Sequence, residues 1–177
     1  METYTVSVVL ENVELTDDVL DALFTAIEDV VPSSIDSLVK VTAPVAASDD
    51  AGAAFQLVDE IQRAIPGARA LRLDQDLVSI PDIAERARRT RESVRLLADG
   101  KRGPGGFPSP VGSVGDAIRV WPWAAVADWF RTSLHEDLGE RGVTPETAAL
   151  VDACLAGHIA PRWRESRRSS AAAVSRR

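Results

Sequence analysis

Seven basic side chains lie within seventeen consecutive positions of the chain, namely Arg86, Arg88, Arg89, Arg91, Arg95, Lys101 and Arg102. Guanidinium and ammonium groups donate hydrogen bonds to phosphate oxygens and, in the case of arginine, to the edges of bases. The same pattern is also compatible with a solvated surface on which Glu85 and Glu92 are helical neighbours of the arginines. The chemistry to be tested is therefore binding to a polyanion.

Charge is divided unequally along the chain, although the whole chain has a formal net charge of -7. Residues 1–78 contain 15 acidic and four basic side chains, a net charge of -11, whereas residues 79–177 contain 12 acidic and 16 basic side chains, a net charge of +4. An acidic part joined to a basic part indicates two modules with different partners.

Two short helices are predicted around the basic cluster. Ser79 is suited to cap the first helix, which contains Pro81 in its first turn. Thr90 is suited to cap the second, and Gly100 to end it. Two such helices separated by about three residues predict a helix-turn-helix.

On the second helix, Arg91 and Arg95 are four residues apart and lie on one face, opposite an apolar stripe. In a helix-turn-helix, residues near the start of the second helix reach base edges in the major groove. Thr90 and Glu92 belong to the same candidate DNA contact set, and Glu92 can either accept a hydrogen bond from cytosine or act in helix capping.

A glycine- and proline-rich segment follows, and it leads to a predicted hairpin with strands at 110–114 and 118–121. Lys101, Arg102 and Arg119 would flank the second helix and contact phosphates. The aromatic residues around this hairpin could stack on single-stranded bases. Helical spacing of Val126, Trp129 and Phe130 instead favours a place in the core.

Residues 77–130 resemble the winged helix-turn-helix of the MerR superfamily, including its AlpA and excisionase-like branch. The matching pieces are IPDIAERA, RRT, RESVRLLADG, GGFPSPV, RVW and PWAAVADWF, in that order. The resemblance implies binding to double-stranded DNA as a homodimer, and aromatic residues that pack the hairpin against the second helix.

Two positions depart from the family pattern. Arg88 stands where the family has a glycine, and Arg89 where it has an apolar residue. An arginine in a left-handed backbone conformation costs some stability, so either this cost is present or the turn has another geometry. Both arginines are candidates for phosphate contacts.

The N-terminal residues predict a small α/β unit. Strands are expected near residues 4–10, 35–42 and 68–74, with helices from Asp17 to Pro32 and from Asp49 to Ile65. This order, with a possible short strand near Val30, predicts a ferredoxin-like sandwich with both helices on one face of the sheet. The fold class is therefore α+β.

The sequence divides into an acidic ferredoxin-like module at 1–76, a winged helix-turn-helix at 77–132, C-terminal helices at 133–160 and a basic disordered tail at 161–177. The helix beginning near Trp123 is expected to continue through Leu134 and Leu138. Another helix is expected to start at Thr144 and Pro145.

Catalytic and metal chemistry have little support, because the chain has one cysteine and two histidines. Cys154 and His158 are four apart on a predicted helix, but further ligands are not evident. We expect no metal, no cofactor and no enzyme activity. The chain also has no apolar run long enough for a membrane span and no signal peptide, which predicts a cytoplasmic, nucleoid-associated protein.

Three functions remain open from the sequence. The first is a sequence-specific, double-stranded DNA-binding protein, most simply a bacterial transcriptional regulator. The second is an antitoxin or adaptor whose acidic N-terminal module binds a protein partner. The third is an excisionase-like architectural protein that bends DNA.

Overall fold

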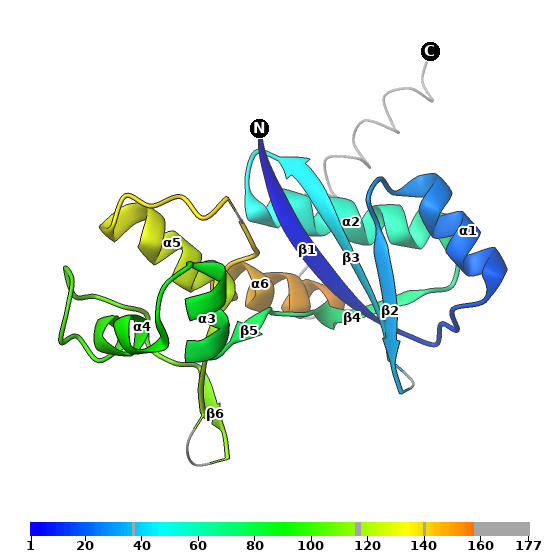
Figure 1. The fold of residues 1–177 in the computed structure, drawn as a ribbon. Coiled ribbons are helices and arrows are strands. Elements are labelled where there is room, and N and C mark those ends of the chain that lie inside the picture. The colour runs from blue at the N-terminus through cyan, green and yellow to red at the C-terminus, as the bar shows by residue number, and fades with distance from the viewer. Residues whose placement is uncertain (37, 116–117, 140, 158–177) are drawn as a thin grey trace.

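The computed structural model describes residues 1–36, 38–115, 118–139 and 141–157. In these ranges the chain is an α+β structure with six helices and two antiparallel sheets, in agreement with the predicted class (Figure 1). The first half contains β1(Glu2–Glu11), α1(Asp17–Ala26), β2(Val31–Ile35), β3(Leu38–Ala47), α2(Asp50–Ala64) and β4(Arg69–Leu73). The second half contains β5(Leu77–Val78), α3(Ile80–Arg86), α4(Arg91–Ala98), β6(Gly112–Val114), β7(Ile118–Pro122), α5(Trp123–Ser133) and α6(Pro145–Leu155).

The larger sheet has the strand order β2-β3-β1-β4, and each neighbouring pair is antiparallel. Val8 lies opposite Val41 and Val6 opposite Ala43, so these apolar side chains share one face of the sheet. Helices α1 and α2 pack on that face, where Leu57 of α2 is completely buried in the same core cluster.

The other face of this sheet is polar near its centre. Ser7 lies opposite Thr42, and their hydroxyl oxygens are 2.7 Å apart. Lys40 lies on the same face as Thr42, because alternate residues of a strand point the same way.

The strand predicted at 35–42 is present as β3, but β3 begins at Leu38 and continues to Ala47, whereas Ile35 ends the preceding strand β2. Helix α1 also ends earlier than the apolar spacing predicted. It stops at Ala26, Asp29 has a left-handed φ of 51°, and Val31 begins β2. Pro32 is tolerated in β2 because this is an edge strand, where a missing backbone donor need not break a ladder.

Helix α6 packs against the N-terminal sheet and not beside α5. Ala148 and Val151 are fully buried in the N-terminal core cluster. The Asp152 carboxylate accepts a hydrogen bond of 2.7 Å from the backbone N–H of Leu73 in β4. The predicted segment 133–160 is thus divided between the two cores of the molecule.

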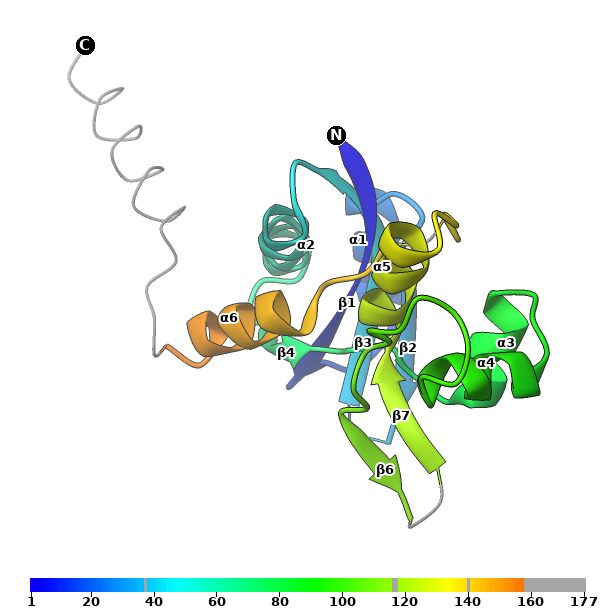
Figure 2. The ribbon, with the colours of Figure 1, turned by 90° about the vertical axis from the view of Figure 1, so that its left-hand side faces the viewer.

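The segment that leads into α6 runs beside β1. The backbone N–H of Thr5 donates to the Arg141 carbonyl at 2.7 Å, and Thr5 and Gly142 form a parallel bridge. We refer to β1–β4 with residues 141–157 as the N-terminal unit, and to residues 77–138 as the central unit (Figure 2).

The central unit has its own core, which includes Val94, Leu97, Trp121 and Phe130. The smaller sheet, of order β5-β7-β6, joins the start of this unit to the hairpin. The predicted continuation of α5 is wrong: the helix ends at Ser133, and His135 has a φ of 58°. Leu134 and Leu138 still pack against the central core from the segment that follows.

Candidate nucleic-acid interface

The turn between α3 and α4 closes with a left-handed residue. Arg88 has a φ of 51°, its N–H donates to the Glu85 carbonyl at 3.1 Å, and the N–H of Arg89 donates to the Ala84 carbonyl at 2.8 Å. These two bonds are the pattern of a Schellman motif, in which glycine usually holds the left-handed position. Arginine therefore occupies the strained left-handed position. Of the two alternatives predicted for this turn, the strained backbone is the one present, and not a different turn geometry.

The predicted caps of both helices are present. The Asp82 carboxylate accepts hydrogen bonds from the backbone N–H and hydroxyl of Ser79, at 2.8 and 2.6 Å, and these bonds lower the pKa of Asp82. Thr90 accepts a bond of 3.1 Å from the N–H of Ser93. Gly100, with a φ of 66°, ends α4. Local sequence thus fixes both helices and the turn between them.

The predicted contact residues lie on α4 and on the segments before and after it in the chain, with one further residue on β7. The turn and N-cap supply Arg88, Arg89 and Thr90, the helix supplies Arg91, Glu92 and Arg95, the following loop supplies Lys101 and Arg102, and β7 supplies Arg119. All nine are exposed or half-buried.

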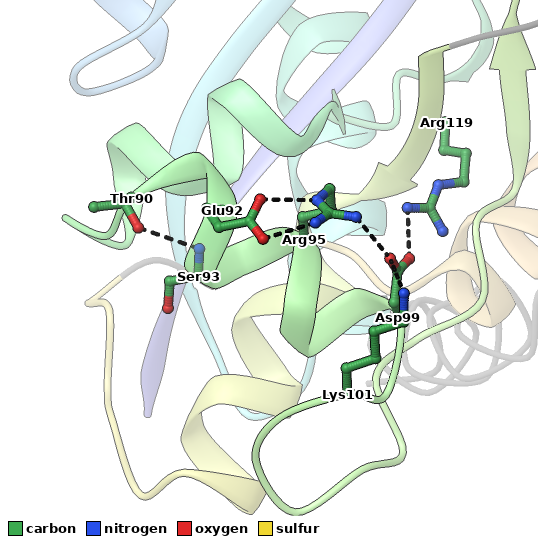
Figure 3. Close-up of polar contacts among 7 residues, drawn as sticks. All are labelled: Thr90, Glu92, Ser93, Arg95, Asp99, Lys101 and Arg119. Atoms are coloured by element: carbon green, nitrogen blue, oxygen red, sulfur yellow. Dashed lines mark hydrogen bonds and ion pairs between the residues drawn. The ribbon is translucent and has the colours of Figure 1, made fainter.

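Arg95 does not project freely from α4. Its Nε and Nη2 donate to the two carboxylate oxygens of Glu92 at 2.9 and 2.7 Å, and its Nη1 is 3.5 Å from Asp99 (Figure 3). The Arg95 hydrogen bonds lower the pKa of Glu92, and the same pair raises the pKa of Arg95. Both groups are ionised at neutral pH, so Arg95 is held along the helix.

Asp99, at the end of α4, interacts with two further cationic side chains. Its Oδ1 accepts a hydrogen bond of 2.9 Å from Arg119 of β7, and Lys101 Nζ lies 4.0 Å from its Oδ2 (Figure 3). The hydrogen bond from Arg119 is the main cause that lowers the pKa of Asp99. Asp99 was not predicted as a site residue, although its spacing of four from Arg95 on one helix was a signal for this pair.

Arg89 is held by the segment after α5. It forms an ion pair with Glu136, and its guanidinium carbon lies 5.5 Å from the centre of the Phe130 ring. The partner is 47 residues away in the chain. Arg89 thus connects the turn to the core of the central unit. This structural role is in addition to its predicted contact with phosphate.

Three predicted cations have no such partner. Within the described part of the chain, the side chains of Arg88, Arg91 and Arg102 form no hydrogen bond or ion pair, and all three residues are exposed. Arg91 is the first residue of α4. These three side chains are available for a ligand without the loss of an existing ion pair.

The hairpin β6–β7 presents apolar side chains. Val111, Val114 and Ile118 are 56%, 64% and 51% exposed. Arg119, which faces Ser113 across the hairpin, also lies 5.2 Å above the Trp121 ring.

The aromatic residues of the central unit are part of its core. Trp121, Trp129 and Phe130 are at most 6% exposed. The indole N–H groups of Trp121 and Trp129 donate to the carbonyls of Pro108 and Gly105, at 2.9 and 3.0 Å, which ties the 103–110 loop to the core. These rings are therefore not available to stack on single-stranded bases.

Metal chemistry has no site in the part of the chain that the structure describes, where no three potential ligands cluster. Cys154 is half-buried on α6, and His158, its possible partner, lies outside the described residues. Across the described helices, none has both the length and the apolar character that a membrane crossing requires.

Comparison of the chain with protein-family models, with curated proteins and with solved structures finds no significant match. Function is therefore inferred from the geometry around α4.

Proposed function

We propose that the protein binds double-stranded DNA in a sequence-specific manner, with α3, α4 and the β6–β7 hairpin acting as a winged helix-turn-helix on a ferredoxin-like N-terminal unit. The observation that carries this proposal is Arg91, an exposed cation without an ion-pair partner among the described residues, at the first position of α4. The N-terminal residues of the second helix contact bases in such motifs, and arginine can donate two hydrogen bonds to guanine.

Phosphate contacts have matching candidates on both sides of α4 in the chain. Arg88 precedes the helix and Arg102 follows it, and both are exposed and free of ion pairs within the described ranges. Lys101 and Arg119 already contact Asp99, so a phosphate would have to compete with that carboxylate. Contacts of this kind orient a protein on the duplex but carry no sequence information.

Transcriptional regulation is the biological role that we infer from this binding. The order of helix pair, aromatic-anchored loop, hairpin and α5 supports the resemblance to the MerR superfamily. An excisionase-like role would use the same surface but would also bend the duplex.

The test is fluorescence anisotropy on a duplex from the region upstream of the protein's own gene, compared with a scrambled duplex, over a salt series. We expect tighter binding to the upstream duplex. Simultaneous Arg88→Ala, Arg91→Ala and Arg102→Ala should weaken binding and lower the salt slope by about 0.9 for each phosphate that is no longer neutralised.

A matched control is the triple variant Arg63→Ala, Arg69→Ala and Arg72→Ala, which makes the same change in net charge within the N-terminal unit. It should retain nearly all of the affinity. Equal, weak binding of the native protein to both duplexes would contradict the proposal, as would equal reductions in affinity in the two triple variants.

A second candidate function is supported by the acidic surface of α1. Asp17, Asp18 and Asp21 are exposed there, and within the described ranges none of them pairs with a cation. A basic protein partner would suit this surface, as expected of an antitoxin or adaptor. Copurification with a basic protein encoded beside it, abolished in an Asp17→Asn, Asp18→Asn and Asp21→Asn variant, would favour this function.

A further inference from the structure

A cleft of about 460 Å³ lies at the junction of the two units. The polar face of the large sheet contributes Thr5, Ser7 and Thr42, and the central unit contributes Pro122 and Trp123. The connector 73–77 and the segment 141–143 also line it. The connection from β4 to β5 and the first residues of the segment that returns to the N-terminal unit therefore border the same cleft.

The charged groups that line the cleft are already paired. Lys40 Nζ is 3.2 Å from Asp74, Asp76 accepts a hydrogen bond of 3.2 Å from Arg86, and Arg141 lies 3.4 and 3.5 Å from two carboxylates. An ionic ligand would have to break one of these pairs or add an unbalanced charge to the cleft.

The side chains of the lining that can still form hydrogen bonds are uncharged. Within the described residues, the half-buried Gln75 carboxamide and the Thr5 hydroxyl form no hydrogen bond. Ser7 and Thr42 share one bond, so each hydroxyl can form another. Trp123 also lines the cleft, is only 3% exposed, and has an Nε1 without a partner in the described structure. Of these residues only Trp123 is buried, whereas Gln75, Ser7 and Thr42 are half-buried and Thr5 is exposed, so their hydrogen-bonding atoms are accessible to a ligand in the cleft.

We propose that the cleft binds a small uncharged heterocycle of nucleobase or nucleoside size. A glutamine carboxamide can pair with a base edge that offers one donor and one acceptor, such as N6 and N7 of adenine. Leu77, Pro122 and Val143 supply apolar surface for the ring. The volume lies within the range of roughly 300–1,000 Å³ that is typical of small-molecule sites.

This site is separate from the basic residues around α4, so its existence does not depend on DNA binding. The free base or nucleoside and the corresponding nucleotide share the same heterocycle. They differ in the phosphate, for which the lining offers no unpaired cation among the described residues.

The test is isothermal titration calorimetry of the full chain with adenine, adenosine, guanosine, cytidine, uridine and thymidine at millimolar concentration, each followed by the corresponding 5′-monophosphate. We expect saturable binding of at least one uncharged compound and weaker binding of its monophosphate. Absence of binding by all uncharged compounds would overturn the proposal, as would tighter binding of the monophosphate.

Two variants locate the binding site. Gln75→Leu and Thr42→Val each remove hydrogen-bonding groups at nearly constant size, and each should weaken binding by about tenfold. Gln56→Leu is the matched control, because Gln56 lies exposed on α2. Thermal melts confirm that all three variants fold. Unchanged affinity in both cleft variants would overturn the assignment of the site.

Discussion

Arg119 of β7 donates a hydrogen bond of 2.9 Å to Asp99 at the C-cap of α4, and so joins the hairpin to the helix. The two residues are 20 positions apart in the chain. The same carboxylate lies near Arg95 and Lys101. Asp99 therefore partly neutralises three of the cations that a phosphate backbone would otherwise attract.

Asp99→Asn should increase affinity for non-specific DNA by a few fold at low salt. The substitution removes the carboxylate that competes with phosphates for Arg95, Lys101 and Arg119. Anisotropy on the scrambled duplex across a salt series measures this effect, and the salt slope should become steeper.

Asp128→Asn is the control for this change. Asp128 is exposed on α5 and pairs with Arg131, so the variant makes the same charge change outside the proposed interface. A gain in affinity as large as that of Asp99→Asn would show a general charge effect and not the release of specific cations.

Arg88→Gly should stabilise the protein while it weakens DNA binding. Glycine removes the strain of the left-handed position at Arg88, and this outweighs the larger entropy of the unfolded glycine chain, with a net gain of up to about 1 kcal/mol. The same change removes an exposed cation. Urea denaturation measures the free energy of unfolding, and anisotropy measures the affinity.

The contrasting variant is Arg102→Gly. Arg102 is also exposed, but it has no positive φ, so glycine there should lower stability by about 0.5–1 kcal/mol. Both variants should bind DNA more weakly. If Arg88→Gly were less stable than the native protein, the strain at this turn would be contradicted.

Asp50 should contribute pH-dependent stability by fixing α6 to α2. Burial raises its pKa, but hydrogen bonds from the Thr144 N–H, the Thr144 hydroxyl and the Thr147 hydroxyl outweigh this, so that the net pKa is lowered. The contribution is therefore complete above the unfolded pKa and is lost as the pH falls toward the folded value. Asp50→Ala should cost about 2 kcal/mol at pH 7 and less in acid, as measured by urea denaturation.

Glu28→Ala serves as the reference for Asp50→Ala. Glu28 is exposed, and no described residue forms an ion pair or hydrogen bond with it. Its removal should change the free energy of unfolding by only a few tenths of a kcal/mol. An Asp50→Ala penalty that does not shrink in acid would show that the ionised carboxylate is not the source of the stability.

Features that depend on neighbouring residues were predictable from the sequence. Ser79, Thr90 and Gly100 end or cap their helices as expected, because capping depends on side chains and backbone within one turn. The early end of α1 at Ala26 was missed, since Ile27 and Val31 continue the apolar spacing, yet Val31 begins β2 and is 61% exposed. Spacing alone does not show which apolar residues a neighbouring element covers.

Features that depend on distant residues were not predictable. Glu136 pairs with Arg89 across 47 positions, and Asp50 binds Thr144 across 94. Nothing in the local pattern of either carboxylate identifies its partner, because the fold alone brings them together. Arg91 and Arg95 are a different case: they were given the same role from the sequence, although Glu92 stands three residues before Arg95 and its ion pair with Arg95 distinguishes the two arginines.

Arg91→Ala should therefore reduce sequence-specific binding more than Arg95→Ala. Arg91 can meet a base edge directly, and removal of such an interaction costs about 1–3 kcal/mol. Arg95 must first leave Glu92 and Asp99, so its contact with DNA offers a smaller net gain. Anisotropy of both variants on the upstream and scrambled duplexes gives the ratio of affinities for each.

Glu92→Gln frees Arg95 and supplies the complementary test: Arg95→Ala should cost more binding free energy in that background than in the native protein. Equal costs in the two backgrounds would show that the Glu92 pair does not restrain Arg95 at the DNA surface.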